Sequence, residues 1–320
     1  MAFFEQDRHF GQLDHPGPKA RLLSVKDILW FVYLFPLRFF ARHLSARNLY
    51  RLGRALEPCF QVVADSRRRS ARERMRRALG ERLNDSEFDD ISRRFVSNAV
   101  WRALDDLHLM DPKSAARLVP PEIHGLDHLT RALAAGNGVV LLTGHFYANR
   151  LAKHHLARMG YPVMSVRNGQ PPDQWMGRIG ARFLQPRYIE FLHSVIGDEV
   201  FIQDPQCSLK IFRRLRSGGI VNVHFDSSFS RHSVELPFLG ASKRFPTGLL
   251  EIVRLSKCSV IPMLCLGNQR AASITFEAPF VFEPAGSREE FASANLGRLV
   301  AQLEQQIREH SAEWEIWTRL

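Results

Sequence analysis

One segment, residues 138–150, constrains the fold more than any other: it reads Gly-Val-Val-Leu-Leu-Thr-Gly-His-Phe-Tyr-Ala-Asn-Arg. The apolar run 139–142 is too short for a helix and has no polar face, so it predicts a strand buried on both sides. Gly144 permits a tight turn, or a close approach of a substrate to the backbone. His145 follows at the carboxyl end of the strand, where open α/β sheets usually bind their ligands. The segment therefore predicts an interior strand that delivers a histidine to a ligand-binding edge.

From about residue 120 onward, strand-like apolar runs alternate with amphipathic helical segments. This alternation predicts an α/β fold with a mostly parallel sheet flanked by helices, here assigned to residues 120–320. Strands are expected at 139–142, 162–166, 188–191, 220–223, 260–266 and 274–276, and helices at 126–135, 149–159, 173–184, 206–217, 247–256 and 288–309.

Two regions are expected before this domain: a flexible lead, residues 1–22, and a helical region, residues 23–119. Within the helical region, residues 25–44 combine many aromatic side chains with basic flanking residues and are interrupted by Pro36. Their uninterrupted apolar length is well short of the ~20 residues that a membrane span needs. The segment fits a helix at the membrane interface, and also a helix buried in a soluble core. The basic residues nearby favour a membrane-associating role.

Residues 67–77 contain seven arginines at a spacing that predicts a helix ending near Gly80. Such a charge run suits a solvated helical face, and equally an attraction to phosphate groups beside the interfacial segment. The four residues 86–89, Ser-Glu-Phe-Asp, resemble a capping box that starts another helix.

The charge of the chain restricts its partners. A net charge of +11 and a pI near 10.0 favour anionic partners such as lipid headgroups or acidic carriers. No nucleic-acid recognition motif accompanies the arginines, so nucleic acid is not an expected partner. The four cysteines form no CxxC pair, which indicates a reducing compartment and no structural zinc. The first twenty residues lack the apolar core of a secretory signal, so we expect no export.

Several blocks of the sequence together carry a resemblance to a known family. The blocks are 141–146, 165–168, 214–226, 234–240, 247–248, 260–262, 303–307 and 314–317. From about residue 25 to residue 320 the chain resembles the late lipid A acyltransferases of the lauroyl and myristoyl type, a branch of the lysophospholipid acyltransferase superfamily. This resemblance implies a glycerolipid acyltransferase-like fold. It also implies a peripheral or monotopic enzyme at the cytoplasmic face of a bacterial inner membrane.

The resemblance further implies a reaction. A fatty acyl group would pass from acyl carrier protein or coenzyme A to a hydroxyl, or an amine, of a membrane glycolipid or lipid-like acceptor. The expected partners are the thioester donor, this acceptor and anionic membrane lipid, and neither a metal nor a cofactor beyond the acyl-ACP or acyl-CoA co-substrate is expected. Such chemistry needs a base for the acceptor proton and donors for the oxyanion. His145 is the candidate base, and the turn at Gly144 is a candidate source of backbone N–H donors.

Other polar residues in these blocks are candidates for the same site. Arg167, Asn168 and Arg231 are predicted to bind substrate. For the two arginines the reason is that guanidinium forks match phosphate oxygens, and a surface position is the alternative. Asp226 lies just past an apolar strand, where it would orient the base or bind a sugar hydroxyl. A turn or helix-cap aspartate is the alternative interpretation.

One position departs from the family pattern His-x4-Asp/Glu, because the fifth residue after His145 is Arg150. A cation beside an imidazole disfavours its charged form. Three interpretations stay open: Arg150 binds a substrate anion, it pairs with a carboxylate such as Asp226 that serves His145, or the chain is a degenerate homologue acting as a lipid-binding or scaffold protein.

Overall fold

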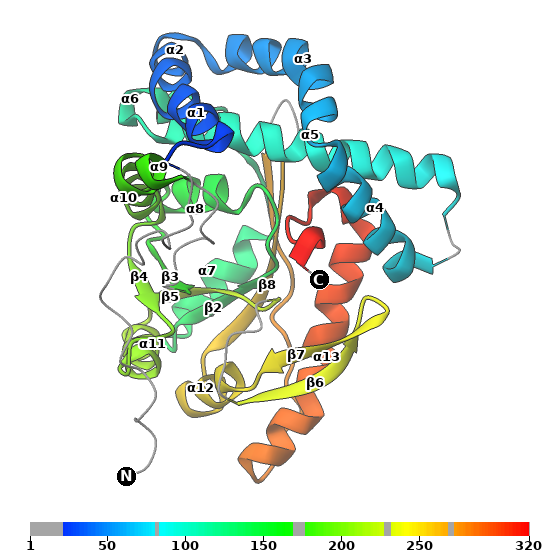
Figure 1. The fold of residues 1–320 in the computed structure, drawn as a ribbon. Helices are drawn as coiled ribbons and strands as arrows, with labels where there is room; N and C mark the ends of the chain where they lie inside the picture. The colour runs from blue at the N-terminus through cyan, green and yellow to red at the C-terminus, as the bar shows by residue number, and fades with distance from the viewer. Residues whose placement is uncertain (1–21, 81–82, 169–176, 227–231, 268–271, 320) are drawn as a thin grey trace.

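The computed structural model describes residues 22–80, 83–168, 177–226, 232–267 and 272–319. Within these residues a seven-stranded sheet runs in the order β1-β9-β8-β2-β5-β3-β4 (Figure 1). The strands are β1 Glu122–His124, β2 Val139–Thr143, β3 Val163–Arg167, β4 Glu199–Phe201, β5 Ile220–His224, β8 Ser259–Gly267 and β9 Ala272–Phe276. All neighbours pair in parallel except β8 and β9, which are antiparallel. The predicted α/β class with a mostly parallel sheet is therefore confirmed.

The central strand β2 is buried along its whole length, between β8 and β5. Its alternate side chains enter two different cores: Val140 and Leu142 belong to one, and Val139 and Leu141 to the other. A strand covered on both faces needs this apolar composition, which is why the run 139–142 has no polar face.

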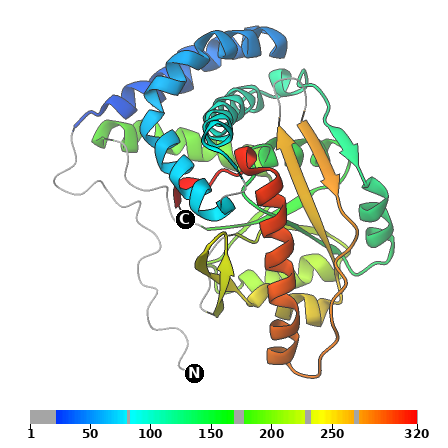
Figure 2. The same ribbon diagram turned by 90° about the vertical axis from the view of Figure 1, so that its right-hand side faces the viewer.

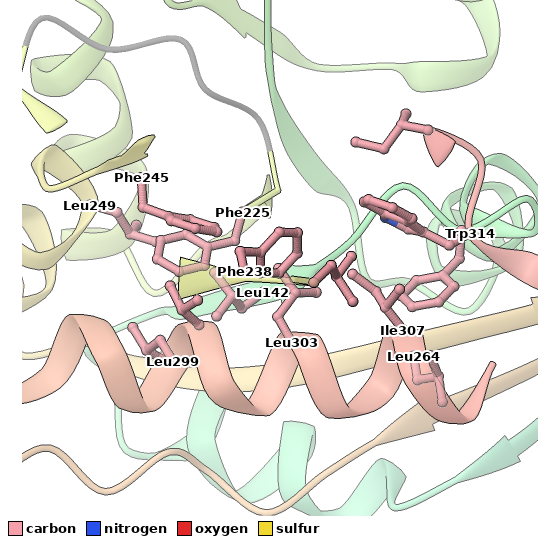
Figure 3. Packing of buried hydrophobic residues seen from close by; sticks show 14 of the residues in the cluster. Leu142, Phe225, Phe238, Phe245, Leu249, Leu264, Leu299, Leu303, Ile307 and Trp314 are labelled. Carbon is pink, nitrogen blue, oxygen red and sulfur yellow. The ribbon is translucent and has the colours of Figure 1, made fainter. Parts of the chain in front are cut away.

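Helices cover both faces of the sheet (Figures 1 and 2). One core includes residues from α11 Cys207–Arg216, α12 Gly248–Ser256 and α13 Arg288–Glu309, and the other includes residues from α7 Leu126–Ala134 and α8 Asn149–Arg158. Figure 3 shows how α13 directs Leu299, Leu303 and Ile307 toward the buried rings and Leu142. This i, i+4, i+8 stripe is the apolar face of an amphipathic helix.

A separate hairpin consists of β6 Ser233–Phe238 and β7 Ala241–Pro246. Leu239 and Gly240 join the strands, both with positive φ, 52° and 77°, as a tight two-residue hairpin turn requires. A side chain at Gly240 would also lie only 2.8 Å from the carbonyl oxygen of Arg77. The hairpin was not predicted as strands. It buries Phe238 and Phe245 in the same core as α13.

The N-terminal region is helical, as expected. Its elements are α1 Val25–Val32, the π-helical turn η1 Tyr33–Leu37, α2 Arg38–His43, α3 Ala46–Val63, α4 Asp65–Leu79, α5 Asp85–Leu109 and α6 Pro112–Ala115. Pro36 lies inside η1, where the wider turn accommodates a residue that has no backbone N–H. Helices α1 to α3 lie together at one end of the sheet, at the top of both Figure 1 and Figure 2.

The segment 25–44 exposes part of its apolar surface and buries another part. Phe39 and Phe40 are exposed, whereas Leu34 and Ala41 are buried. In the described ranges, no helix combines the length and the apolar character needed to cross a membrane. The predicted helix after residue 67 does end at Gly80, where the backbone takes a positive φ of 68°.

Some local predictions were wrong. Residues 188–191 are not a strand, because they lie in α10 Gln185–Ile196. The predicted helix 173–184 is replaced by α9 Arg178–Phe183, with 173–176 outside the described residues. The capping box before α5 uses Asn84 and Glu87, two residues earlier than predicted. Strands β1 and β4 were not predicted, since three residues carry little periodicity. The lead 1–22 falls outside the described residues except for its last residue.

Candidate active site

His145 and Asp226 meet at the carboxyl ends of two adjacent parallel strands. β2 and β5 pair in register, with Thr143 opposite His224, so the residues that follow each strand emerge side by side. Oδ1 of Asp226 lies 2.6 Å from Nδ1 of His145. Oδ2 accepts from the backbone N–H of His145 at 2.7 Å and from the Trp314 indole N–H at 2.7 Å. Asp226 is only 1% exposed, and these three groups make the hydrogen bonds that its carboxylate forms with the described residues.

This geometry fixes the protonation of the pair. Burial acts to raise the pKa of Asp226, but the His145 charge and the hydrogen bonds from His145 and Trp314 outweigh burial and lower it. An ionised carboxylate only accepts hydrogen bonds, so Nδ1 of His145 must carry the proton that it donates. In the neutral ring, the proton acceptor of the imidazole is then Nε2. The side chain of His145 is 30% exposed, so the ring remains within reach of a ligand.

The C-terminal strap, residues 313–315, holds this pair in place. The backbone N–H of Glu315 donates to the carbonyl of His145 at 2.7 Å, and the N–H of Tyr147 donates to the carbonyl of Glu313 at 3.1 Å. Between them, Trp314 is fully buried and packs against Phe238 and Trp317. The tryptophan of the tail therefore positions Asp226, a role that the sequence analysis did not assign.

Gly144 packs tightly, but the turn that follows it does not expose its N–H groups. A side chain at Gly144 would lie 3.1 Å from Leu303 and 3.3 Å from Asp226 Oδ2, so close packing explains the glycine. The next three backbone N–H groups are all engaged: His145 donates to Asp226, Phe146 to the Gly144 carbonyl and Tyr147 to Glu313. These three N–H groups therefore fix His145 in the fold, and an oxyanion role for the turn at Gly144 stays a prediction.

Arg150 does not pair with Asp226, which corrects one of the three interpretations. Its Nη1 forms an ion pair with the carboxylate of Asp106 on α5 and lies 3.3 Å from the Tyr188 hydroxyl. Burial acts to lower the pKa of Arg150, but the Asp106 charge outweighs it and raises the pKa. Arg150 stands where the family pattern has an acid. Its positive charge is therefore balanced by Asp106 on α5, a helix outside the segment 138–150. Substrate binding by Arg150 stays a prediction.

A second ion pair continues this network to the strap. Arg102 of α5 pairs with Glu315. Burial acts to raise the pKa of Glu315, but the charges of Arg102 and Arg150 lower it to about 2. Helix α5 thus links α8, through Arg150, to the strap that carries Trp314.

Of the other predicted substrate-binding residues, two lie at the end of β3, and one lies outside the residues that the structure describes. Arg167 ends β3 and its Nη1 lies 2.7 Å from Oε2 of Glu199 on β4. Asn168 follows directly, and its side-chain oxygen accepts from the Gln203 amide. Arg231 is outside the described residues. The contacts of Arg167 and Asn168 do not test substrate binding, so their binding roles stay predictions.

Two residues in this region were missed. His224 ends β5, and its ring lies 4.4 Å from that of His145 between centroids, tilted by 30°. Lys153, on α8, is 7% exposed and makes no hydrogen bond or ion pair with any residue that the structure describes. Burial, then the charges of Arg167 and Arg150, lower the pKa of Lys153 to about 7. The signal for His224 was its position two residues before Asp226 on a predicted strand.

No group of three or more metal-ligating side chains occurs in the described part of the chain. A polar cavity of about 610 Å³ lies between α5, the end of β8 and the turn before the strap, with Asn98, Trp101, Gly267 and Glu313 among its walls. His145 and Asp226 do not line it. We therefore place the candidate chemistry at the His145–Asp226 pair and not in this cavity.

Comparison with known proteins gives two findings. The model of a family described as "Bacterial lipid A biosynthesis acyltransferase" matches residues 16–319. Two proteins named phosphatidylinositol mannoside acyltransferase, from Mycobacterium tuberculosis strains CDC 1551 / Oshkosh and ATCC 25618 / H37Rv, are 26% and 25% identical over 220 residues. These matches cover 68% of this chain and 65% of each relative, so the chain spans slightly less than two thirds of their length.

Proposed function

Because the chain belongs to the bacterial lipid A biosynthesis acyltransferase family, we propose that it transfers a fatty acyl group from a thioester donor to a membrane lipid acceptor. The donor is acyl carrier protein or coenzyme A carrying the acyl chain, and the acceptor group is a hydroxyl, or an amine, of a glycolipid or lipid-like molecule. The named relatives acylate a phosphatidylinositol mannoside, which supports a glycosylated lipid as the acceptor class.

The observation that carries this proposal is the His145–Asp226 contact of 2.6 Å. The family pattern places an acid five residues after the histidine, and here that position is Arg150. Asp226, from the adjacent strand, supplies the carboxylate that the histidine needs. This observation argues against the degenerate-homologue interpretation, because a buried carboxylate is paired with a histidine whose side chain stays partly exposed.

In the proposed reaction, Nε2 of His145 takes the proton of the acceptor hydroxyl as its oxygen attacks the thioester carbonyl. The imidazolium that forms is stabilised by the ionised Asp226, which also fixes the tautomer. When the tetrahedral intermediate collapses, the carbon–sulfur bond breaks and the thiolate receives the proton from His145. Asp226 remains ionised throughout, held by the Trp314 and His145 N–H groups.

We further propose that the N-terminal helices hold the protein at the cytoplasmic face of the bacterial inner membrane. Support comes from exposed apolar side chains on α1 to α3, namely Ile28, Leu29, Phe31, Val32, Phe39, Phe40, Leu52, Leu56, Phe60, Val62 and Val63. Helix α4 adds exposed arginines such as Arg69 and Arg77. Apolar and cationic side chains together favour binding to anionic lipid surfaces.

The test is thiol release from a panel of saturated fatty acyl-CoA and acyl-ACP thioesters by the purified protein, with and without lipid acceptor extracts. Wild-type protein should release thiol, and His145→Ala should lower the rate by at least ~100-fold, the contribution expected of a positioned general base. His124→Phe, at an exposed position on β1, serves as the control. A wild type as inactive as His145→Ala would favour the lipid-binding or scaffold role instead.

A further inference from the structure

The oxyanion of the proposed reaction needs hydrogen-bond donors. Acyl transfer converts a planar carbonyl into a tetrahedral centre whose oxygen is negative, and fixed donors at that oxygen are worth a large part of the rate. The three backbone N–H groups that follow Gly144 are committed to Asp226, the Gly144 carbonyl and Glu313. With these three groups engaged, a side chain near His145 is a candidate donor.

The His224 ring lies beside that of His145, tilted by 30°, and its tautomer is set by Asn149. The Asn149 Nδ2 atom lies 2.6 Å from the Gly144 carbonyl oxygen. A carbonyl only accepts, so the amide nitrogen, and not its oxygen, must face this region. The same nitrogen lies 3.2 Å from Nε2 of His224. Two N–H groups cannot bond each other, so Nε2 of His224 is the acceptor and carries no proton.

A neutral imidazole whose Nε2 is unprotonated carries its proton on Nδ1. The surroundings reinforce the neutral state: burial first, then the positive charges of His145, Lys153, Arg167 and Arg150, lower the pKa of His224 well below 6.5. No residue that the structure describes accepts a hydrogen bond from this Nδ1–H. His224 is nevertheless only partly buried, as contact with a ligand requires.

Positively charged side chains near His224 make its Nδ1–H a stronger hydrogen-bond donor. Alternate residues of a strand share a face, so Arg167 and His224 lie on the same side of the sheet as Val163 and Ile220, which pack beneath α8. Lys153 lies one helical turn after Asn149 on α8, over this layer. Cations behind an imidazole discourage its protonation and polarise its N–H toward a developing negative charge.

From this geometry we propose that His224, as a neutral imidazole, donates its Nδ1–H to the carbonyl oxygen of the acyl thioester as that oxygen becomes an oxyanion. The inference rests on the proposed acyl transfer. The acceptor oxygen forms a bond to the carbonyl carbon, the carbonyl π pair moves onto the oxygen held by His224, and His145 Nε2 takes the acceptor proton. The carbonyl then re-forms, the carbon–sulfur bond breaks, and the thiolate takes the proton from His145.

The distance between the two rings suits this division of roles. The two rings lie 4.4 Å apart between centroids, so one tetrahedral centre can contact an edge of each. A neutral histidine as the electrophile beside a separate base is an established arrangement, and it requires an imidazole whose protonation is suppressed.

Two variants test the donor. His224→Phe keeps an aromatic ring against His145 but removes the N–H, so kcat for thiol release should fall by about 100-fold or more, with little change in KM. His224→Gln restores an N–H donor and should recover part of the loss. Thermal unfolding of each variant must match wild type for the comparison to count, with His124→Phe as the matched histidine control.

A second measurement does not depend on activity. Nitrogen-15 NMR of histidine-labelled protein should show His224 neutral near pH 7, with its proton on Nδ1, and Asn149→Asp should shift the proton toward Nε2. An active wild type with unchanged kcat in His224→Phe, or a His224 protonated on Nε2 in wild type, overturns the inference alone. A wild type that releases no thiol overturns the proposed function and this inference with it.

Discussion

The Asp226 carboxylate lies 2.6 Å from Nδ1 of His145, although 81 residues separate the two in the chain. The pair forms because β2 and β5 are adjacent and in register, so both residues emerge at one edge of the sheet. Trp314 closes the arrangement from a third segment, with its indole N–H 2.7 Å from the same carboxylate. An acid that follows a neighbouring strand thus contacts the histidine, whereas the family pattern places an acid on the helix after the histidine.

We predict that Asp226→Asn lowers thioester turnover by about 100-fold or more, because an amide neither stabilises the imidazolium nor enforces the Nδ1–H tautomer. The measurement is steady-state thiol release at pH 7. Asp127→Asn, an exposed aspartate on α7, should leave turnover unchanged. Normal turnover in Asp226→Asn would remove Asp226 from the catalytic pair.

Arg150→Glu is expected to destabilise the protein and not to improve the enzyme. The new carboxylate would face Asp106, which is 3% exposed, and would leave two like charges buried together. Breaking a buried ion pair costs about 3–5 kcal/mol of unfolding free energy, and urea denaturation of the variant would measure this loss. The swapped double variant Arg150→Glu/Asp106→Arg should recover most of that loss. A gain of thioester turnover in Arg150→Glu over a silent wild type would instead support the degenerate interpretation.

The double variant Phe39→Ser/Phe40→Ser should weaken binding to vesicles that contain anionic lipid. Each ring is more than half exposed in the protein, and burying such a side chain in an apolar environment contributes about 1.5–3 kcal/mol. Co-sedimentation with vesicles should therefore show a loss of at least tenfold in partitioning, since about 1.4 kcal/mol is a factor of ten.

The control for membrane binding is Val281→Ser, an exposed apolar residue outside the N-terminal helices. Salt should weaken binding of wild type and variant alike, because the arginines of α4 are unchanged. Equal partitioning of the double variant and wild type would exclude these two rings from the membrane contact.

Lys153→Met is expected to raise stability most at neutral pH. Burial and nearby positive charges lower the pKa of Lys153 from 10.5 to about 7, so between these pH values the unfolded chain binds a proton that the native protein lacks. The contribution of Lys153 to stability therefore rises with pH across this window and is most unfavourable at pH 7 and below.

Thermal unfolding from pH 7 to 10 should thus show the largest excess stability of Lys153→Met over wild type at pH 7, shrinking toward pH 10. The exposed Lys113 on α6 offers the matched control, since Lys113→Met should show no such trend. A difference between Lys153→Met and wild type that does not change with pH would mean that Lys153 keeps an ordinary pKa.

Local patterns in the sequence determined much of the fold. The run 139–142 pointed to an interior strand, because it is short, rich in β-branched and aliphatic residues and has no polar face, as a strand covered on both faces requires. The stripe through Leu299, Leu303 and Ile307 fixed α13 and its buried face. The failure at 188–191 has the same origin: Tyr188, Phe191 and Leu192 satisfy a strand run and a helical i, i+3, i+4 spacing equally. Packing of the Tyr188 ring against Trp30, 4.5 Å between centroids, favours the helix.

The sequence by itself determined that a histidine follows a buried strand, that an aspartate follows another, and that the chain belongs with the lipid A acyltransferases, because each depends on residues close together in the chain. Only the tertiary structure decided which polar and charged groups meet. Asp226 reaches His145, Arg150 reaches Asp106, and Asn149 reaches His224. These pairings depend on strand order, on register and on the positions of helices α5 and α8. A buried charge takes whichever partner the fold places within hydrogen-bond distance, because leaving it unpaired costs more than any local preference.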